Sequence, residues 1–355
     1  MSDLTEILTA SVLEAFRTKQ PLRIVGGDSK AFYGREISDE PLRIGEHKDV
    51  VSYEPTELVI TARAGTPLRE LESVLAAQGQ MLPFEPPAFG ESATLGGTIA
   101  CNLSGPRRPY LGSARDFVLG CRIINGRGEA MHFGGEVMKN VAGYDVSRLQ
   151  CGAMGTLGVL LEISLKVLPR PEAELTLIQQ CSGDEAIDTM NRLGGQPLPL
   201  SAACHDGENL YIRLSGTEAG INAARARVGG DEYAEGKTFW KELKEHELPF
   251  FGNDLPLWRV SLPPAAAMLN IPGKKILDWG GGQRWIHSEE AAQRIRGIAA
   301  KAGGHATLFR TGSSNGNGEQ PFHPLARGLM MLHQRLKQSF DPHGVLNPGR
   351  MYREI

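Results

Sequence analysis

The stretch LGGTIACNLSGPRRPYLGSARDFVLG (residues 95–120) decides the fold prediction for this chain. A glycine pair is followed by a short β-prone run, a loop rich in Asn, Ser and Gly, and a second apolar strand. Glycines let the backbone approach a ligand without an intervening side chain, and free N–H groups in such turns bind anions. The stretch therefore predicts a site where backbone meets a large, flat, phosphorylated ligand.

Two further segments have the same character. RIVGGDSKAFYG (23–34) is a strand that runs into a glycine turn, and GYDVSRLQCGAMGTLGVLLEISLKVLPRP (143–171) ends in a long apolar strand. The first segment has neither the GxGxxG order of a Rossmann turn nor the GxxxxGK[ST] order of a nucleoside-triphosphate loop. Taken by itself, the turn favours a simple strand-to-helix connection, with an anion-binding nest as the alternative. The residues that would form such a nest are Gly26, Gly27, Asp28, Ser29 and Lys30.

The composition is that of a globular protein with an excess of glycine. Hydrophobic residues make up 41% and charged residues 22% of the 355 residues. Glycine accounts for 43 residues, well above the ~7% that is typical. The formal net charge is −3 and no block of Lys and Arg stands out, which disfavours a nucleic-acid partner.

The first 20 residues and the cysteines bear on the compartment. Residues 1–20 predict an amphipathic helix rather than a signal peptide, and no run of about 18 apolar residues exists that could span a membrane. We expect a cytoplasmic protein, with attachment to the inner membrane through partner subunits as an open alternative. The five cysteines are widely spaced without a CxxC pair, which predicts buried thiols rather than a zinc site or an iron–sulfur cluster.

The pattern of the remaining elements predicts an α+β protein. Asn125-Gly126 between two β-prone runs predicts a hairpin, and so does Asp206-Gly207. Beyond residue 171 strands alternate with helices, which favours a ferredoxin-like antiparallel layer. A last helix at about 323–340 has apolar residues at 325, 329, 332, 336 and 340, which predicts one buried face.

In this order, the three glycine-rich segments resemble the PCMH-type, or vanillyl-alcohol-oxidase-type, FAD-binding family. GTLGV (155–159) is similar to the Gly-Thr-Leu-Gly-Ile of that family, and DPHGVLNPGRM (341–351) is similar to its Asp-Pro-x-Gly-x-Leu-Asn-Pro-Gly ending. The resemblance implies a two-lobed FAD-binding domain over residues 1–171 and a smaller ferredoxin-like α/β-sandwich domain over 172–310. It implies further that the C-terminal segment 321–355 returns to the FAD domain.

The resemblance also implies the cofactor and the residues that hold it. Some family members attach the flavin to a His in the pyrophosphate loop, and 23–34 has none, which implies non-covalent FAD. Besides 26–30, the implied cofactor-binding residues are Thr94, Gly96, Gly97, Ile99, Asn102, Gly112, Ser113, Asp116, Gly155, Gly158 and Val159. For Asn102 and Asp116, turn capping is an equal alternative. The paired metal histidines of related dehydrogenases are absent from AGGHATLFR (302–310), so no metal is expected and no catalytic residue is assigned.

The implied activity is the oxidation of a small 2-hydroxy acid, glycolate first and D-lactate second, with FAD as hydride acceptor. Two partners are implied: a larger homologous FAD subunit and an iron–sulfur subunit. Two alternatives remain, a self-sufficient FAD-dependent 2-hydroxy-acid dehydrogenase and a non-catalytic flavin-bearing scaffold that only relays electrons or holds the complex together. A metal-free substrate site built from Arg259, Arg284 or His287 would favour the self-sufficient enzyme.

Overall fold

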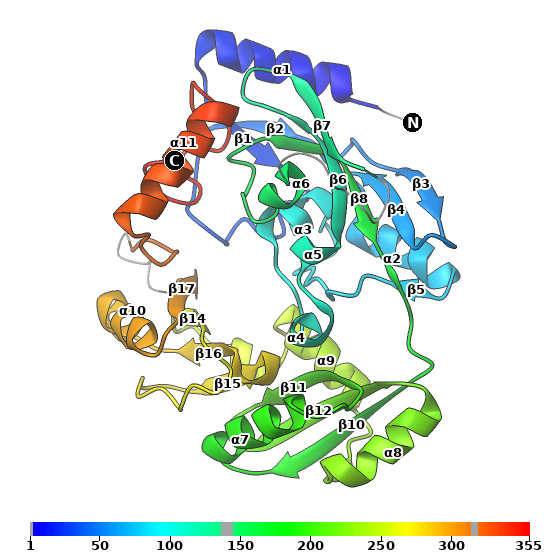
Figure 1. The fold of residues 1–355 in the computed structure, drawn as a ribbon. Coiled ribbons are helices and arrows are strands. Elements are labelled where there is room, and N and C mark those ends of the chain that lie inside the picture. The colour runs from blue at the N-terminus through cyan, green and yellow to red at the C-terminus, as the bar shows by residue number, and fades with distance from the viewer. Residues whose placement is uncertain (1–2, 136–144, 314–318) are drawn as a thin grey trace. The chain divides into compact units, whose positions relative to one another are not determined.

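The computed structural model describes residues 3–135, 145–313 and 319–355, and its contacts divide the chain into two compact units (Figure 1). Unit 1 comprises Met1–Ser104, Gly112–Pro169 and Pro324–Ile355, and unit 2 comprises Gly105–Leu111 and Arg170–His323. The C-terminal segment thus belongs to the same unit as the N-terminal segments. The short segment Gly105–Leu111 belongs to unit 2, although the sequence analysis placed it in the N-terminal domain.

The reason for this difference is a set of contacts that the local sequence does not show. The indole Nε1 of Trp279 donates to the carbonyl oxygen of Gly105 at 3.0 Å. Arg107 is only 4% exposed and forms an ion pair with Glu174. Both contacts join the segment to residues more than 60 positions away, so packing rather than chain order assigns it to unit 2.

Unit 1 is built around a five-stranded antiparallel sheet. The strand order is β3 (Val50–Glu54), β4 (Val59–Arg63), β8 (Val159–Lys166), β6 (Val118–Ile124) and β7 (Ala130–Gly134). Two smaller ladders join β1 (Leu22–Val25) to β2 (Glu40–Arg43) and β5 (Gln80–Met81) to β9 (Leu168–Pro169). The central strand β8 has buried side chains on both faces, as a covered sheet requires.

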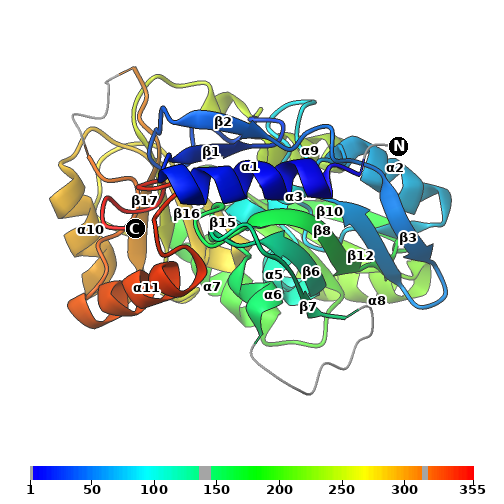
Figure 2. The same cartoon turned by 90° about the horizontal axis from the view of Figure 1, so that it is seen from above.

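The helices of unit 1 pack around this sheet, and most of them contribute residues to its core. They are α1 (Thr5–Thr18), α2 (Leu68–Ala77), α3 (Leu95–Cys101), α5 (Ala114–Phe117), α6 (Val146–Leu149) and α11 (Arg327–Phe340). Helix α1 buries Leu8, Val12 and Ala15, and Figure 2 shows it lying along β1 and β2. None of the helices within the described ranges is long and apolar enough to cross a membrane.

Two local predictions in unit 1 had opposite outcomes. The hairpin at Asn125-Gly126 is confirmed, because β6 pairs with β7 and the Asn125 side chain accepts hydrogen bonds from two backbone amides of the turn. The β-prone run after Gly97 is wrong, since Leu95–Cys101 is the helix α3. Thr94 is the N-cap of this helix, its hydroxyl accepting from the backbone N–H of Gly97 at 3.2 Å. Capping and the burial of one helix face outweigh the β-preference of so short a run.

Unit 2 contains an eight-stranded antiparallel sheet. The order is β13 (Asp231–Glu232), β10 (Ala173–Gln180), β12 (Asn209–Gly216), β11 (Leu200–His205), β15 (Lys275–Asp278), β16 (Gln283–His287), β14 (Leu257–Ser261) and β17 (His305–Arg310). Its helices are α4 (Arg108–Leu111), α7 (Gly183–Gly194), α8 (Glu218–Val228), α9 (Gly236–Glu245), α10 (Ala292–Lys301) and the 3-10 turns η1 (Pro249–Phe251) and η2 (Trp279–Gly281). The predicted hairpin at Asp206-Gly207 is confirmed as β11–β12.

The helices of unit 2 cover both faces of this sheet. Helices α7 and α8 share a core with alternate residues of β12, such as Leu210 and Ile212. Helix α9 packs on the residue between them, with the rings of Phe239 and Tyr211 stacked at 3.9 Å. Because successive side chains of a strand point to opposite faces, α9 lies on the other side of the sheet. The mixed, two-unit α+β architecture agrees with the predicted fold class.

Candidate functional site

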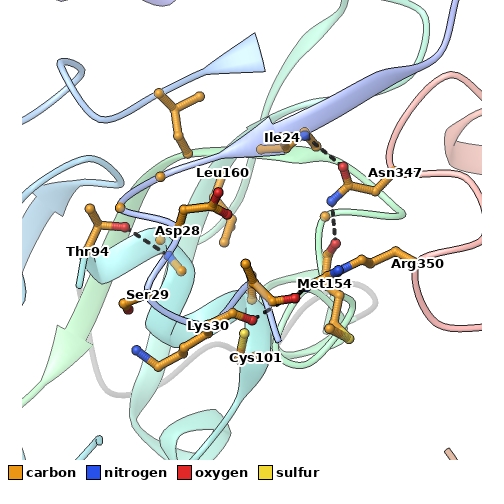
Figure 3. Close-up of a pocket in the computed structure, with 18 of the residues that line it drawn as sticks. Ile24, Asp28, Ser29, Lys30, Thr94, Cys101, Met154, Leu160, Asn347 and Arg350 are labelled. Atoms are coloured by element: carbon orange, nitrogen blue, oxygen red, sulfur yellow. Dashed lines mark hydrogen bonds between the residues drawn. The ribbon is translucent and has the colours of Figure 1, made fainter. Parts of the chain in front are cut away.

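A pocket in unit 1 forms where segments far apart in the chain converge (Figure 3). It encloses about 710 Å³ of empty space, its open mouth included. The walls come from β1 and the loop after it, from helix α3, from the loop that leads into β8, and from the segment after α11. The predicted site residues that line it are Gly26, Gly27, Asp28, Ser29, Lys30, Thr94, Gly96, Gly97, Gly155 and Gly158.

The loop after β1 presents backbone donors to this pocket. Within the described part of the chain, no hydrogen bond uses the backbone N–H of Gly27, Asp28 or Ser29 as its donor. Asp28 has a φ of 56°, which bends the loop into the left-handed region. A Cβ on Gly27 would lie 1.4 Å from the carbonyl oxygen of Ser92, so only glycine lets the two backbones approach. Successive free amides in such a turn form an anion-binding nest.

Two cationic side chains accompany this loop. Lys30 is 7% exposed, and its Nζ donates to the carbonyl oxygen of Ala88 at 3.1 Å. Arg350 comes from the C-terminal segment and donates to the carbonyl oxygens of Ala31 and Tyr33 at 2.8 and 2.7 Å. Figure 3 shows both side chains beside the loop. Arg350 therefore holds the shape of the loop and adds positive charge to the pocket.

Both glycines of helix α3 line the pocket, but only Gly97 has space for a Cβ. A Cβ on Gly96 would lie 2.7 Å from the Cβ of Ala64, whereas a Cβ on Gly97 would meet only the hydroxyl of Thr94, at 3.3 Å. Cys101 follows one helical turn later and also lines the pocket. Burial raises the pKa of its thiol, so Cys101 lines the pocket as a neutral group.

Asn347 joins three of the converging segments. Its side-chain oxygen accepts from the backbone N–H of Ile24, and its side-chain nitrogen donates to the carbonyl oxygen of Met154, both at 2.7 Å. The ending that contains Asn347 and Arg350 resembles that of the family, but the sequence indicates no role for either residue. Ala100, Cys101 and Met154 were also not predicted, because a side chain's face on a helix or loop depends on packing.

Six predicted cofactor-binding residues do not line this pocket. Ile99 and Val159 are fully buried in the core of unit 1. Asn102 caps the C-terminus of α3 with a φ of 51°, and its side-chain oxygen accepts from the backbone N–H of Arg115. The remaining three are Gly112, with a φ of 118°, and Ser113 and Asp116, which form the capping box of α5. Direct contact of these residues with a cofactor stays a prediction. The first two residues of the third glycine-rich segment, 143 and 144, lie outside the described residues.

The residues considered for a metal-free substrate site are largely engaged within unit 2. Arg284 is fully buried and donates to the carbonyl oxygens of Ala266 and Ala267. His287 is 2% exposed and its Nδ1 lies 3.1 Å from the carbonyl oxygen of Leu255. Burial lowers the pKa of His287, which keeps its ring neutral at neutral pH. Both residues therefore support the fold of unit 2 rather than a substrate site.

Arg259, the third of these candidates, has other partners. Its Nε donates to the side-chain oxygen of Gln283 at 2.6 Å, and its guanidinium lies 5.1 Å from the ring centroid of Trp279. Arg108 lies 4.4 Å from the same ring. Two arginines on one indole are cation–π contacts that position α4 and η2 against the sheet of unit 2.

The pocket in unit 1 fits FAD. The amide nest at 27–29 and the cations Lys30 and Arg350 suit a diphosphate, and the free space at Gly97 accepts a flat group close to the backbone. The apolar lining is formed by Ile24, Ile44, Ala100, Met154 and Leu160. An apolar slot with a few polar groups at one end is typical of cofactor sites.

Comparisons with known proteins agree with this chemistry. Residues 5–134 match the model of the FAD binding domain family. The chain is 51% identical over 353 residues to the protein named "Glycolate oxidase subunit GlcE" of Escherichia coli (strain K12), covering 99% of both chains. It is 32% identical over 129 residues to "Glycolate oxidase subunit GlcD" of Bacillus subtilis (strain 168), covering 36% of this chain and 27% of that protein.

Two further similarities extend these comparisons. The chain is 34% identical over 130 residues to a D-lactate dehydrogenase of Anaerostipes hadrus, covering 36% of this chain and 27% of that protein. A solved structure of alkyldihydroxyacetonephosphate synthase superposes with a TM-score of 0.68 at 17% identity, covering 97% of this chain and 74% of that one. The structural likeness concerns the fold alone. The FAD binding domain match and the pocket together identify FAD as the cofactor.

Proposed function

Because this chain belongs to the family of the glycolate oxidase subunit GlcE, we propose that it is an FAD-bearing subunit of a glycolate oxidase complex. The observation that carries the proposal is 51% identity across 99% of both chains. The complex oxidises glycolate to glyoxylate, the alcohol giving up two electrons and two protons, and D-lactate is a second substrate. The D-lactate dehydrogenase among the relatives supports this second assignment.

Bound FAD supplies the acceptor for the hydride that leaves the alcohol carbon. The residues of this chain bind and orient it. The amides of Gly27, Asp28 and Ser29 would hold the diphosphate, with Lys30 nearby as a buried cation. The apolar walls of the pocket would exclude water from the part of the cofactor that they enclose. Arg350 keeps the loop in its binding shape through the carbonyl oxygens that it engages.

The complex contains two further subunits, a larger homologous FAD subunit and an iron–sulfur subunit. The GlcD relative, whose name assigns it to glycolate oxidase, supports the first of these. We propose the second because electrons that leave the flavin need an acceptor. The five cysteines of this chain lack the spacing of a set of iron–sulfur ligands, so the acceptor cluster is assigned to another subunit. We place the chain in the cytoplasm, at the membrane only through its partners.

We expect about one FAD per chain, bound without a covalent link. The reason is that 23–34 contains no histidine for attachment, while the pocket offers amides and cations instead. Acid or heat precipitation of the purified protein should release intact FAD into the supernatant, measured by its absorbance. Flavin that stays with the precipitated chain would contradict non-covalent binding, and a colourless protein that ignores added FAD would contradict the cofactor assignment.

The isolated, FAD-saturated chain is expected to oxidise glycolate weakly or not at all. The arginine and histidine considered as a substrate site, Arg284 and His287, are bound to backbone carbonyls of unit 2. The measurement is glycolate-dependent dye reduction by the chain alone and by the complex reconstituted with its partner subunits. Turnover by the chain alone equal to that of the complex would establish the self-sufficient dehydrogenase. A complex that keeps its activity when FAD is removed from this chain would establish a scaffold that only holds the complex together.

A further inference from the structure

Helix α11 leaves exposed part of the face that its sequence predicts to be buried. Phe340 at its C-terminal end packs against the core of unit 1, and Leu336 is half-buried. One and two turns earlier, Leu332 and Leu329 are 52% and 51% exposed. We call Leu329, Leu332, His333 and Leu336 the α11 seam. Their i, i+3, i+4, i+7 spacing is that of a helix face which packs on another helix.

A hollow adjoins the seam. His333 and Leu336 line it from α11, and Leu149, Leu157 and Met351 form its apolar floor. It encloses about 650 Å³ of empty space, its open mouth included. A flat lipid surface has no side chain to fill such a hollow, whereas a protein partner does. The hollow therefore favours a protein over a membrane as the occupant of this surface.

The charged side chains of α11 and those that line the hollow are basic. The sequence of α11, RGLMMLHQRLKQSF, contains no Asp or Glu, and Arg335 lies exposed beside the seam. Arg115 and Arg148 line the hollow, the latter 3.4 Å from Asp145 across an exposed pair. Exposed ion pairs of this kind contribute little, so Arg148 remains available to a stronger partner. The surface complements an apolar segment with acidic flanks.

We propose that the α11 seam and its hollow dock an amphipathic helix with acidic flanks from another subunit of the complex. The inference rests on the proposed function, since it supplies the partner. An apolar stripe on the incoming helix covers Leu329 and Leu332, and one of its larger side chains fills the hollow. Its acidic flank faces Arg115 and Arg335. Burial of the two leucines supplies affinity, and the charges supply orientation and encounter rate.

The test compares two variants of the same helix. L329E/L332E places carboxylates in the seam, and M331E is the matched control, because Met331 is 44% exposed but lies on another side of α11. Each full-length variant is co-expressed with the other glycolate oxidase subunits, and affinity is measured between purified components. We expect L329E/L332E to weaken assembly about 100-fold and M331E to change it less than about 3-fold. FAD content and melting temperature of both should match the wild type.

Each other outcome has a definite meaning. Assembly that is unaffected by L329E/L332E overturns the docking proposal and leaves the proposed function standing. A wild-type chain that fails to assemble with these subunits overturns the proposed function and the docking proposal with it.

Two further experiments test other occupants of the seam. If L329E/L332E abolishes sedimentation with vesicles of phosphatidylcholine and phosphatidylglycerol but leaves assembly intact, the seam binds a membrane. Self-association of the isolated chain that the same variant abolishes would assign it to a second copy. Either of these last two results overturns the proposal.

Discussion

Replacing Gly97 by valine is expected to abolish FAD binding and to leave the apo-protein folded. A Cβ at this position would meet only the hydroxyl of Thr94, at 3.3 Å, and otherwise enters the pocket. The branched side chain would therefore occupy space that the cofactor needs, which we expect to weaken FAD binding by about 100-fold or more. The helix propensity of valine is at least as high as that of glycine, so the free energy of unfolding of the apo-protein should change by less than about 1 kcal/mol.

The measurement is flavin absorbance per mole of purified protein, with the circular dichroism melting curve as the test of folding. Gly194→Val is the matched control, because Gly194 ends α7 in unit 2 and no atom lies within 4 Å of the Cβ that it would gain. That variant should bind FAD like the wild type. Unchanged flavin content in Gly97→Val would show that α3 does not face the cofactor. Gly96→Val is unsuitable as a test, since its Cβ would collide with Ala64.

Lys337→Met is expected to destabilise the protein by about 3–5 kcal/mol. Lys337 is 7% exposed, and its Nζ donates to the Asp341 carboxylate at 2.7 Å. It also donates to the carbonyl oxygens of Thr156 and Leu346 at 2.8 and 2.6 Å. Burial lowers the pKa of Lys337, and the charge of Asp341 opposes that shift. Methionine keeps the aliphatic volume but leaves the Asp341 carboxylate charged and buried without its cation.

The effect should extend to the cofactor. Asp341 accepts from the backbone amides of Val345 and Leu346, so it shapes the turn that leads to Asn347 in the pocket. Urea unfolding of the FAD-loaded protein measures the loss of stability, and fluorescence of released FAD measures the loss of affinity. Gln334→Met on the exposed side of α11 is the control and should change stability by less than about 0.5 kcal/mol. A Lys337→Met variant as stable as this control would show that the buried ion pair contributes nothing.

Local signals in the sequence were sufficient wherever a few neighbouring residues decide the conformation. Asn125 closes its hairpin with its own side chain, and Ser182 caps α7 through a box with Glu185. Helix α3 shows where such signals fail, because its seven residues are held by the Thr94 cap and by contacts with β4 and β8. For a run that short, intrinsic preference is smaller than the free energy of packing.

The residues of the candidate site likewise divide into those that neighbouring residues indicate and those that only distant contacts bring to the pocket. The glycine turn at 26–30 lines the pocket, and the resemblance to the family rather than the turn by itself indicated contact with phosphate. The sequence matched DPHGVLNPGRM to the family but could not assign Arg350, whose partner Ala31 lies 319 residues away. The sequence also does not show which side chains of α3 point toward the pocket. Ile99 was predicted to contact the cofactor, whereas in the structure it lies in the core and Cys101 lines the pocket.

By itself, the sequence determined the family, the cofactor, the turns and the order of most strands and helices. The family and the cofactor follow from the resemblance of the glycine-rich motifs. The turns, strands and helices depend on residue types at short spacing, where backbone sterics and hydrogen bonds act locally. The tertiary structure alone decided that residues 105–111 join unit 2, that Asn347 ties three segments at the pocket, and that the first half of α11 stays exposed. Each of these depends on contacts between residues distant in the chain, and close packing of the whole fold selects such contacts.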